Sequence, residues 1–254
     1  MNFSEKFLKT ANSFVNTVII VILFISALYA GYSLWDNYRV YAQAENVQED
    51  LLRFKPNADG DRMSVKLSFE ELRNINKDVC AWLTIDNTNI DYPILQGEDN
   101  MAYVNTDVYG DFSLAGSIFL DYRCAKDFSD PYSIVYGHHM SDSKMFGDID
   151  KYKKKKFFDE NKTGVLITPN KTFNLKIFAV LVVPDSNQIV FNPNNSKDLN
   201  KIIQSAEDWS LYSDKAMMSK IKNNPSSQVV ALSTCSNEFT DARTVLLAQM
   251  IPRS

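Results

Sequence analysis

A single uncharged, apolar run near the N-terminus constrains the fold more than any other feature of the chain. Residues 18–34 read VIIVILFISALYAGYSL and contain no charged side chain. With Phe14, Val15 and Trp35 at its flanks, the run reaches the roughly 20 residues that a membrane-spanning helix requires. A buried helix of a globular domain is less favoured, because no face of the segment is polar. We therefore predict one transmembrane helix over residues 15–35.

The charges around this run predict the orientation of the helix. Lys6 and Lys9 precede it, whereas Asp36 is the first charged residue after it. Positive charge before the span favours a cytoplasmic N-terminus over residues 1–14 and an extracellular remainder. A cleaved signal peptide is the alternative, since residues 42–44 (Ala-Gln-Ala) have a small-x-small pattern. The run is longer than the ~7–15 residues of a signal-peptide core and ends well before that site, which favours a retained anchor in the cell membrane.

The composition excludes several classes of protein. The 254 residues are 45% hydrophobic and 23% charged, and 27 Lys and Arg against 31 Asp and Glu give a net charge of −4. This balance lacks the basic footprint of a nucleic-acid-binding protein. Two histidines and three scattered cysteines offer no paired-ligand spacing for a structural zinc ion. We expect a folded globular domain that binds neither nucleic acid nor a structural metal.

The chain after the span divides into a stalk and one folded domain. The mixed, charged stretch over residues 36–63 predicts a helical stalk and linker, and residues 64–254 predict the domain. Ser68 and Glu71 form a capping-box pattern, which predicts a short helix that begins there and ends near Asn76.

Eight short β-like runs dominate the domain. Each is rich in Val, Ile, Leu, Phe or Tyr and is bounded by Gly, Pro, Asn or Asp, as strands are. They cover residues 80–85, 90–95, 117–120, 133–136, 164–168, 173–183, 229–234 and 244–251. Eight such runs predict a mainly β fold, a closed or nearly closed β-barrel.

A long interruption over residues 192–224 separates the sixth and seventh runs. It contains two helix-like segments, 197–209 and 214–222. Connections in compact domains usually have about 4–6 residues, and longer ones are often functional. We expect this insertion to contribute to substrate specificity; a packing element that covers the barrel is the alternative.

Three side chains at predicted strand ends are candidates for chemistry. His138 follows the run 133–136 and Gly137, and Cys235 follows the run 229–234. Arg243 begins the last run, across a loop that joins two antiparallel neighbours. A nucleophilic cysteine needs a base or a cationic neighbour to form its thiolate. It also needs donors for the oxyanion of the tetrahedral intermediate. One Cys, one His and one Arg therefore predict an acyl-transfer site.

The remaining cysteines and a basic run have simpler interpretations. Cys80 and Cys124 lie in or beside strand-like runs, which predicts buried, inert thiols. A disulfide stays open in an exported protein, although three cysteines cannot all pair. Residues 151–156 (Lys-Tyr-Lys-Lys-Lys-Lys) could attract an anionic surface, but a solvated face is favoured over a binding site.

The motif Leu-Ser-Thr-Cys at 232–235 followed by Arg243, with Tyr-Gly-His at 136–138 about a hundred residues upstream, resembles the sortases. These are membrane-anchored cysteine transpeptidases of Gram-positive bacteria. The resemblance covers essentially the whole chain. The helical N-terminal extension and the insertion at 192–224 resemble class B of the family.

The resemblance implies an eight-stranded sortase-type β-barrel with N-terminal helices and a helical insertion before the cysteine strand. It implies that Cys235 attacks a threonine carbonyl in the C-terminal sorting signal of secreted proteins, forming a thioacyl-enzyme. His138 would act as acid and base, and Arg243 would hold the substrate and stabilise the oxyanion. His139 would have no required role.

The resemblance also suggests substrate-binding residues and partners. Tyr136, Ser233 and Thr234 would bind substrate beside the catalytic residues, and Asn105 resembles a substrate-contacting asparagine of class B. The acceptor amine would belong to a peptidoglycan cross-bridge or its lipid-linked precursor. No cofactor is implied. Two alternatives stay open: a thiol hydrolase that uses the same residues with water as acceptor, and a membrane-tethered binding module with an inert thiol.

Overall fold

Helix α1 (Phe3–Leu52) contains the predicted membrane span. The computed structural model describes residues 3–194 and 198–253. Residues 1–2 of the expected cytoplasmic segment, 195–197 of the expected insertion, and Ser254 therefore lie outside the described residues. The mean hydropathy of α1 reaches 2.3 over its most apolar 18 residues, so its length and composition suffice to cross a membrane. The chain divides into two compact units, Met1–Ala42 and Gln43–Ser254.

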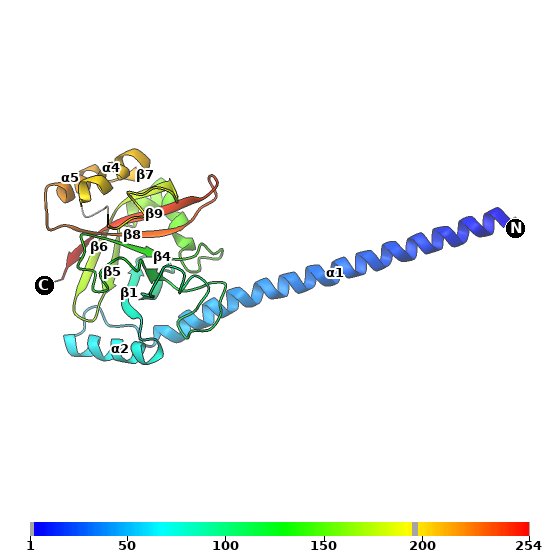
Figure 1. Ribbon diagram of the computed structural model, residues 1–254, viewed down its shortest axis with the longest axis horizontal. Coiled ribbons are helices and arrows are strands. Elements are labelled where there is room, and N and C mark those ends of the chain that lie inside the picture. Colours follow the sequence, from blue (N-terminus) through cyan, green and yellow to red (C-terminus); the bar gives the residue numbers. More distant parts are fainter. Residues whose placement is uncertain (1–2, 195–197, 254) are drawn as a thin grey trace. The chain divides into compact units, whose positions relative to one another are not determined.

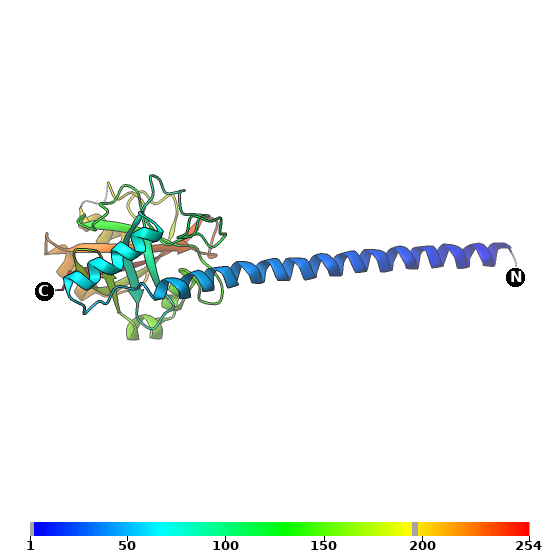
Figure 2. The same ribbon diagram turned by 90° about the horizontal axis from the view of Figure 1, so that it is seen from below.

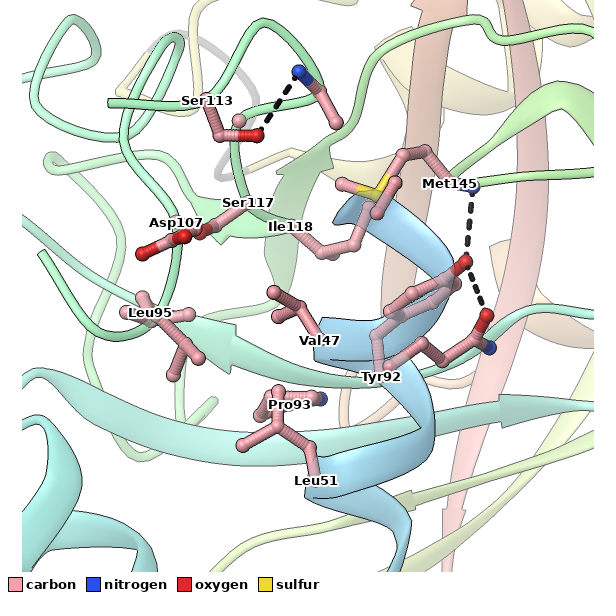
Figure 3. A pocket seen from close by; sticks show the side chains of 15 residues that line it. Val47, Leu51, Tyr92, Pro93, Leu95, Asp107, Ser113, Ser117, Ile118 and Met145 are labelled. Atoms are coloured by element: carbon pink, nitrogen blue, oxygen red, sulfur yellow. Dashed lines mark hydrogen bonds between the residues drawn. The ribbon is translucent and has the colours of Figure 1, made fainter. Parts of the chain in front are cut away.

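The last turns of α1 belong to the second unit and pack against the barrel. Leu51 is 2% exposed, and Gln48 donates from Nε2 to the carbonyl oxygen of Asn89 at 2.9 Å. Its Oε1 accepts a hydrogen bond from the hydroxyl of Tyr92 at 2.9 Å. Figure 3 shows the mainly apolar pocket that remains here, with Val47 and Leu51 of the helix facing Leu95. The end of the predicted stalk is thus part of the folded domain.

Helix α2 (Arg62–Ile75) begins earlier than the sequence pattern predicted. Asp61 caps it by accepting a hydrogen bond from the backbone N–H of Ser64 at 2.8 Å. The predicted start at Ser68 was wrong, because Ser68 lies within the helix and its hydroxyl donates to the carbonyl of Ser64. Val65, Phe69 and Leu72 form the buried stripe of this helix, at the spacing of one helical face.

Eight strands form the predicted closed barrel. Their spatial order is β1-β2-β3-β4-β8-β9-β6-β5, and β5 closes the barrel by pairing with both β6 and β1. The fold class and all eight strand positions are therefore confirmed. The strands are β1 (Val79–Ile85), β2 (Asp91–Leu95), β3 (Phe119–Leu120), β4 (Tyr132–Tyr136), β5 (Thr163–Ile167), β6 (Thr172–Pro184), β8 (Gln228–Cys235) and β9 (Ala242–Pro252).

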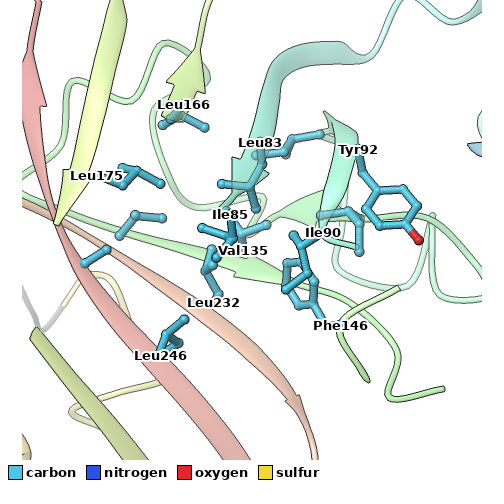
Figure 4. Packing of buried hydrophobic residues seen from close by; sticks show 14 of the residues in the cluster. Leu83, Ile85, Ile90, Tyr92, Val135, Phe146, Leu166, Leu175, Leu232 and Leu246 are labelled. Carbon is cyan, nitrogen blue, oxygen red and sulfur yellow. The ribbon is translucent and has the colours of Figure 1, made fainter. Parts of the chain in front are cut away.

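The barrel interior is filled by alternating residues of these strands. Figure 4 shows Leu83, Leu166 and Leu175 meeting Leu232 and Leu246 across the core. Because side chains of a strand alternate between its two faces, the neighbours of these residues point outward. The outward residues are buried too where a helix covers them, so much of the barrel wall is apolar on both sides.

The insertion covers one side of the barrel. It contains α4 (Leu199–Trp209) and α5 (Lys215–Lys222), with a short strand β7 (Ser210–Ser213) between them that the sequence pattern missed. Strand β7 extends the sheet by pairing with β6. Figure 1 shows α4 and α5 on the opposite side of the barrel from α2, and Figure 2 gives the perpendicular view.

Between β4 and β5, the 3₁₀ helix η1 (Gly147–Lys153) and helix α3 (Lys155–Glu160) carry the basic run. Lys151 pairs with Asp148 at 2.8 Å and Lys155 pairs with Asp159 at 2.6 Å. Lys153 lies among acidic groups as well, with Asp150 at 2.7 Å. Much of the charge of this run is therefore neutralised within the protein.

Candidate active site

The pairing of two parallel strands brings His138 and Cys235 to the same edge of the barrel. Tyr136 of β4 is the register partner of Ser233 of β8. His138 lies two positions after Tyr136, and Cys235 lies two positions after Ser233. Because the two strands run parallel, both residues lie at the same height along the barrel. The sequence analysis placed both at strand ends; the register explains why those two ends coincide.

Gly137 permits the close packing between Tyr136 and His138. A Cβ atom at this position would lie 2.4 Å from Cδ1 of Ile118 and 2.8 Å from the ring of Phe146. The Gly137 N–H donates to the carbonyl of Ser233 at 3.1 Å, which extends the contact between β4 and β8. A side chain here would force Ile118, Phe146 or the segment that carries His138 to shift.

Cys235 and Arg243 are direct register partners in the antiparallel pair of β8 and β9. The Nη1 group of Arg243 lies 2.7 Å from Sγ of Cys235. Its Nη2 group lies 3.7 Å from Oδ2 of Asp185, which follows β6. A guanidinium at this distance places N–H hydrogen-bond donors directly beside the sulfur.

The two other cysteines differ sharply from Cys235. All three are free thiols, but Cys80 and Cys124 are buried whereas Cys235 is exposed. Burial raises the pKa of Cys80 to about 12 and that of Cys124 to about 12. Both therefore stay protonated at neutral pH, which agrees with their predicted inertness.

A backbone carbonyl determines the tautomer of His138. Its Nε2 lies 2.7 Å from the carbonyl oxygen of Val104. A carbonyl oxygen can only accept a hydrogen bond, so Nε2 carries a proton in this contact. Nδ1 is then the nitrogen that can take up and release a proton during a reaction.

The side chains meet in a pocket, here called the strand-end pocket. It contains six of the seven predicted site residues; Asn105 is not among its lining residues and is exposed. None of the described residues of the insertion lines it, and these residues pack against the barrel instead. The pocket is lined by Asn100, Val104, Phe119, Tyr136, Gly137, His138, Ser233, Thr234, Cys235 and Arg243.

Asn100, Val104 and Phe119 line the pocket although no sequence pattern predicts them. The first two come from the long loop between β2 and β3, and Phe119 begins the short strand β3. That loop has no regular alternation of apolar residues that would show which side chains face a pocket. Asn100 precedes Asn105 on the same loop, so the predicted residue type lies in the pocket at a different position.

A buried carboxylate orients two side chains of the pocket. Asp121 is fully buried and accepts hydrogen bonds from Tyr136 Oη at 3.1 Å and Asn100 Nδ2 at 2.9 Å. Arg123 binds both of its oxygens, at 2.8 and 2.7 Å. Burial opposes ionisation, but these donors outweigh it and lower the pKa of Asp121, so the carboxylate stays charged. Two pocket residues are thereby held in place.

Two hydroxyl groups of the pocket make no hydrogen bond within the described part of the chain. Ser233 Oγ and Thr234 Oγ1 are buried and have no partner there. A buried, unpaired hydroxyl is costly, and such groups often serve a ligand. Both residues immediately precede Cys235, where a bound substrate would lie.

The residues described contain no cluster of three or more His, Cys, Asp or Glu side chains that could hold a metal ion. The arrangement offers instead an exposed thiol, a guanidinium in contact with it, and an imidazole in the same pocket. Side chains of these three kinds can act as nucleophile, oxyanion donor and acid–base residue in acyl transfer through a covalent intermediate.

Comparison with known proteins agrees with this chemistry. The family model of the sortase domain matches residues 83–251. The chain is 33% identical over 192 residues to sortase B of Listeria monocytogenes, covering 74% of this chain and 76% of that protein.

Two solved structures extend the comparison. The crystal structure of Spy0129, a Streptococcus pyogenes class B sortase involved in pilus biogenesis, is 38% identical with a TM-score of 0.65, covering 72% of this chain and 97% of that one. A substrate complex of Staphylococcus aureus sortase B is 26% identical with a TM-score of 0.70, covering 86% and 99%. The chain therefore belongs to the sortase family of cysteine transpeptidases, in its class B branch.

Proposed function

We propose that this transpeptidase is anchored in the cell membrane, cleaves the C-terminal sorting signal of secreted proteins, and joins them to a peptidoglycan amine. The observation that carries this proposal is the contact of Arg243 with the exposed thiol of Cys235, in a pocket that also contains His138. The acceptor is the amine of a peptidoglycan cross-bridge or of its lipid-linked precursor.

In the first half of the reaction, Sγ of Cys235 attacks the carbonyl carbon of the threonine in the sorting signal. Arg243 donates hydrogen bonds to the oxyanion that forms. The peptide C–N bond then breaks, and the imidazolium of His138 gives its Nδ1 proton to the leaving amine. The products are a thioester between enzyme and substrate and the released C-terminal peptide.

In the second half, the acceptor amine attacks the thioester carbon. His138, now neutral, takes a proton from the attacking nitrogen, and the C–S bond breaks to regenerate the thiolate beside Arg243. The Val104 carbonyl supports both steps, because its hydrogen bond keeps the proton on Nε2 and leaves Nδ1 for transfer.

Four residues are proposed to bind the substrate. Ser233 and Thr234 offer hydroxyl groups that have no partner within the described residues, and Tyr136 is held against the pocket by Asp121. Asn105 is exposed on the loop that carries Val104, and its contact with substrate stays a prediction. No metal ion or cofactor takes part in the proposed steps.

The proposed topology has residues 1–14 in the cytoplasm, residues 15–35 in the membrane and the catalytic domain outside. The apolar composition of α1 and the lysines at positions 6 and 9 support it. Protease added to intact cells stripped of their wall should digest the catalytic domain and spare the N-terminal segment. A mature protein that starts near Glu45 would instead support a cleaved signal peptide.

Mass spectrometry of the reaction products tests the proposed chemistry. Residues 36–254 are incubated with a peptide library, with and without a peptidoglycan-derived amine. An amine adduct supports transpeptidation, whereas the free acid alone in both samples supports the hydrolase alternative. Cys235→Ala should form no acyl-enzyme, and Cys80→Ala should retain most activity. An acyl group on Cys80 or Cys124 would contradict the assignment.

A further inference from the structure

A polar network outside the strand-end pocket joins the residues that follow His138 and Cys235. Nε2 of His139 lies 2.7 Å from Oδ2 of Asp150 in η1. Nζ of Lys153, also in η1, lies 2.7 Å from Oδ1 of the same carboxylate. Nζ also donates to Ser236 Oγ at 2.9 Å. None of these four residues lines the pocket.

Lys153 is the centre of this network. Its ammonium group contacts a third oxygen, Oε1 of Glu238, at 2.6 Å. Lys153 thus forms ion pairs with Asp150 and Glu238 and donates one hydrogen bond to Ser236. Burial opposes the charge of Lys153, but the hydrogen bonds to Asp150 and Glu238 outweigh it and raise the pKa of Lys153.

The hydroxyl group of Ser236 uses its full capacity for hydrogen bonds. Its hydroxyl accepts hydrogen bonds from Lys153 and from Oγ1 of Thr244, the latter at 2.9 Å, and donates one to Glu238. A hydroxyl has one donor and two acceptor sites, so none is left over. The Ser236 N–H donates to the carbonyl of Ala242 at 2.9 Å. The residue after Cys235 is thus held from several directions at once.

The place of the network explains why it matters for the reaction. The register of β4 and β8 runs only to Tyr136 and Ser233, and Gly137 adds one backbone contact. His138 and Cys235 lie beyond that register, where the network links η1 and His139 to Ser236. Catalysis needs the sulfur and the imidazole in one fixed geometry, and a displacement of about 1 Å can cost about 100-fold in rate.

We infer that Lys153 is a positioning residue for transpeptidation. It holds the segment after Cys235 against η1, and through Asp150 it holds the segment after His138. The inference rests on the proposed roles of Cys235 and His138. It also distinguishes Lys153 from the other lysines of the basic run, because Lys151 and Lys155 form ion pairs that do not reach the loop after Cys235.

The test compares Lys153→Met with Lys155→Met, each of which removes an ammonium group that pairs with a carboxylate. Lys155 lies outside the network, and its pair with Asp159 is largely exposed. For Lys153→Met we expect kcat to fall about 10- to 100-fold with the KM for peptide changed less than about threefold. Lys155→Met should keep the wild-type kcat. Lys153→Arg should recover part of the loss, because a guanidinium can also bind two carboxylates.

Every other result of these measurements either supports or overturns the positioning role of Lys153. Wild-type kcat in Lys153→Met, or an equal loss in Lys155→Met, would overturn it. If Lys153→Met fails to fold, Glu238→Gln decides: a lower kcat supports the inference and an unchanged kcat overturns it. Cys235→Ala is measured alongside. An active Cys235→Ala would overturn both the proposed function and the positioning role, whereas an inactive Cys235→Ala with a wild-type Lys153→Met overturns the positioning role alone.

Discussion

Strand β8 has two regions with opposite surroundings. Residues 229–232 are buried on both faces: Val230 and Leu232 point into the barrel, and Val229 and Ala231 point toward the cluster under α4 and α5. Residues 233–235 are polar and line the strand-end pocket: Ser233 and Thr234 are buried with hydroxyls unpaired within the described residues, and the thiol of Cys235 is exposed.

The difference shows how the end of a strand can hold its side chains in a fixed position. A strand segment that is packed on both faces cannot shift without opening a cavity, since protein interiors are close-packed. The buried half therefore fixes the direction of the polar half. Substitutions in the polar half should change the reaction without changing stability, and substitutions in the buried half should do the reverse.

The largest expected effect is the loss of Arg243 or His138. Arg243→Ala should reduce kcat about 100- to 1,000-fold, because an oxyanion donor is lost. His138→Ala should have an effect of similar or greater size, because proton transfer is lost. Peptide cleavage rates and thermal melting measure the two consequences separately. A melting temperature that falls in parallel with activity would contradict a purely chemical role for these two side chains.

The next effect concerns the buried half. Leu232→Ala should lower the free energy of unfolding by about 2–5 kcal/mol, because a fully buried leucine leaves a cavity. Activity per folded molecule should stay close to wild type. Urea denaturation gives the first quantity, and titration of the reactive thiol gives the folded fraction. A large fall in kcat per folded molecule would show that the two halves are not separable.

A smaller effect is expected for the unpaired hydroxyls. Ser233 and Ser133 are both buried without a hydrogen-bond partner in the described residues, but Ser133 does not line the pocket. Ser233→Ala should raise the KM for peptide about fivefold, the loss of roughly one hydrogen bond. Ser133→Ala serves as the matched control and should leave KM unchanged. Equal values of KM in both variants would show that Ser233 does not bind the substrate.

The smallest effect depends on pH. The hydrogen bond to Asp150 raises the pKa of His139 above 6.5, against the opposing effect of burial. The protonated form thus stabilises the fold below the ordinary pKa, and this contribution is lost as pH rises through the raised value. The melting temperature of wild type should exceed that of His139→Ala more at about pH 5.5 than at about pH 9. A pH-independent difference would contradict the pairing.

The strands and the Cys–His–Arg set could be predicted because their signals are local. Short apolar runs between turn residues mark the strands, and the candidate residues follow such runs directly. The parallel register of β4 and β8 is not local, since Tyr136 and Ser233 are far apart in sequence. Their proximity followed from the family resemblance and is explained only by the fold.

The rest could not be predicted because it depends on loops and on competing signals. Asn100 and Val104 reach the pocket through a loop without periodicity, so the sequence pattern does not single them out. For α2, the capping-box pattern at Ser68 lies inside the helix, and the true cap, Asp61, is recognised only from the folded backbone. Lys153 cannot be told from its neighbours in a run of lysines until the fold brings Glu238 beside it.

The packing of the last turns of α1 has a practical consequence for a soluble form of the enzyme. Because the compact unit starts at Gln43, a soluble form cut before that residue keeps the helical cover over Leu95 and Val108. A form that starts at residue 64 would expose those side chains to water and lose the contact of Gln48 with Tyr92. A protease that cuts α1 before Gln43 would therefore leave the folded unit intact, whereas a cut a few residues later would remove part of its helical cover.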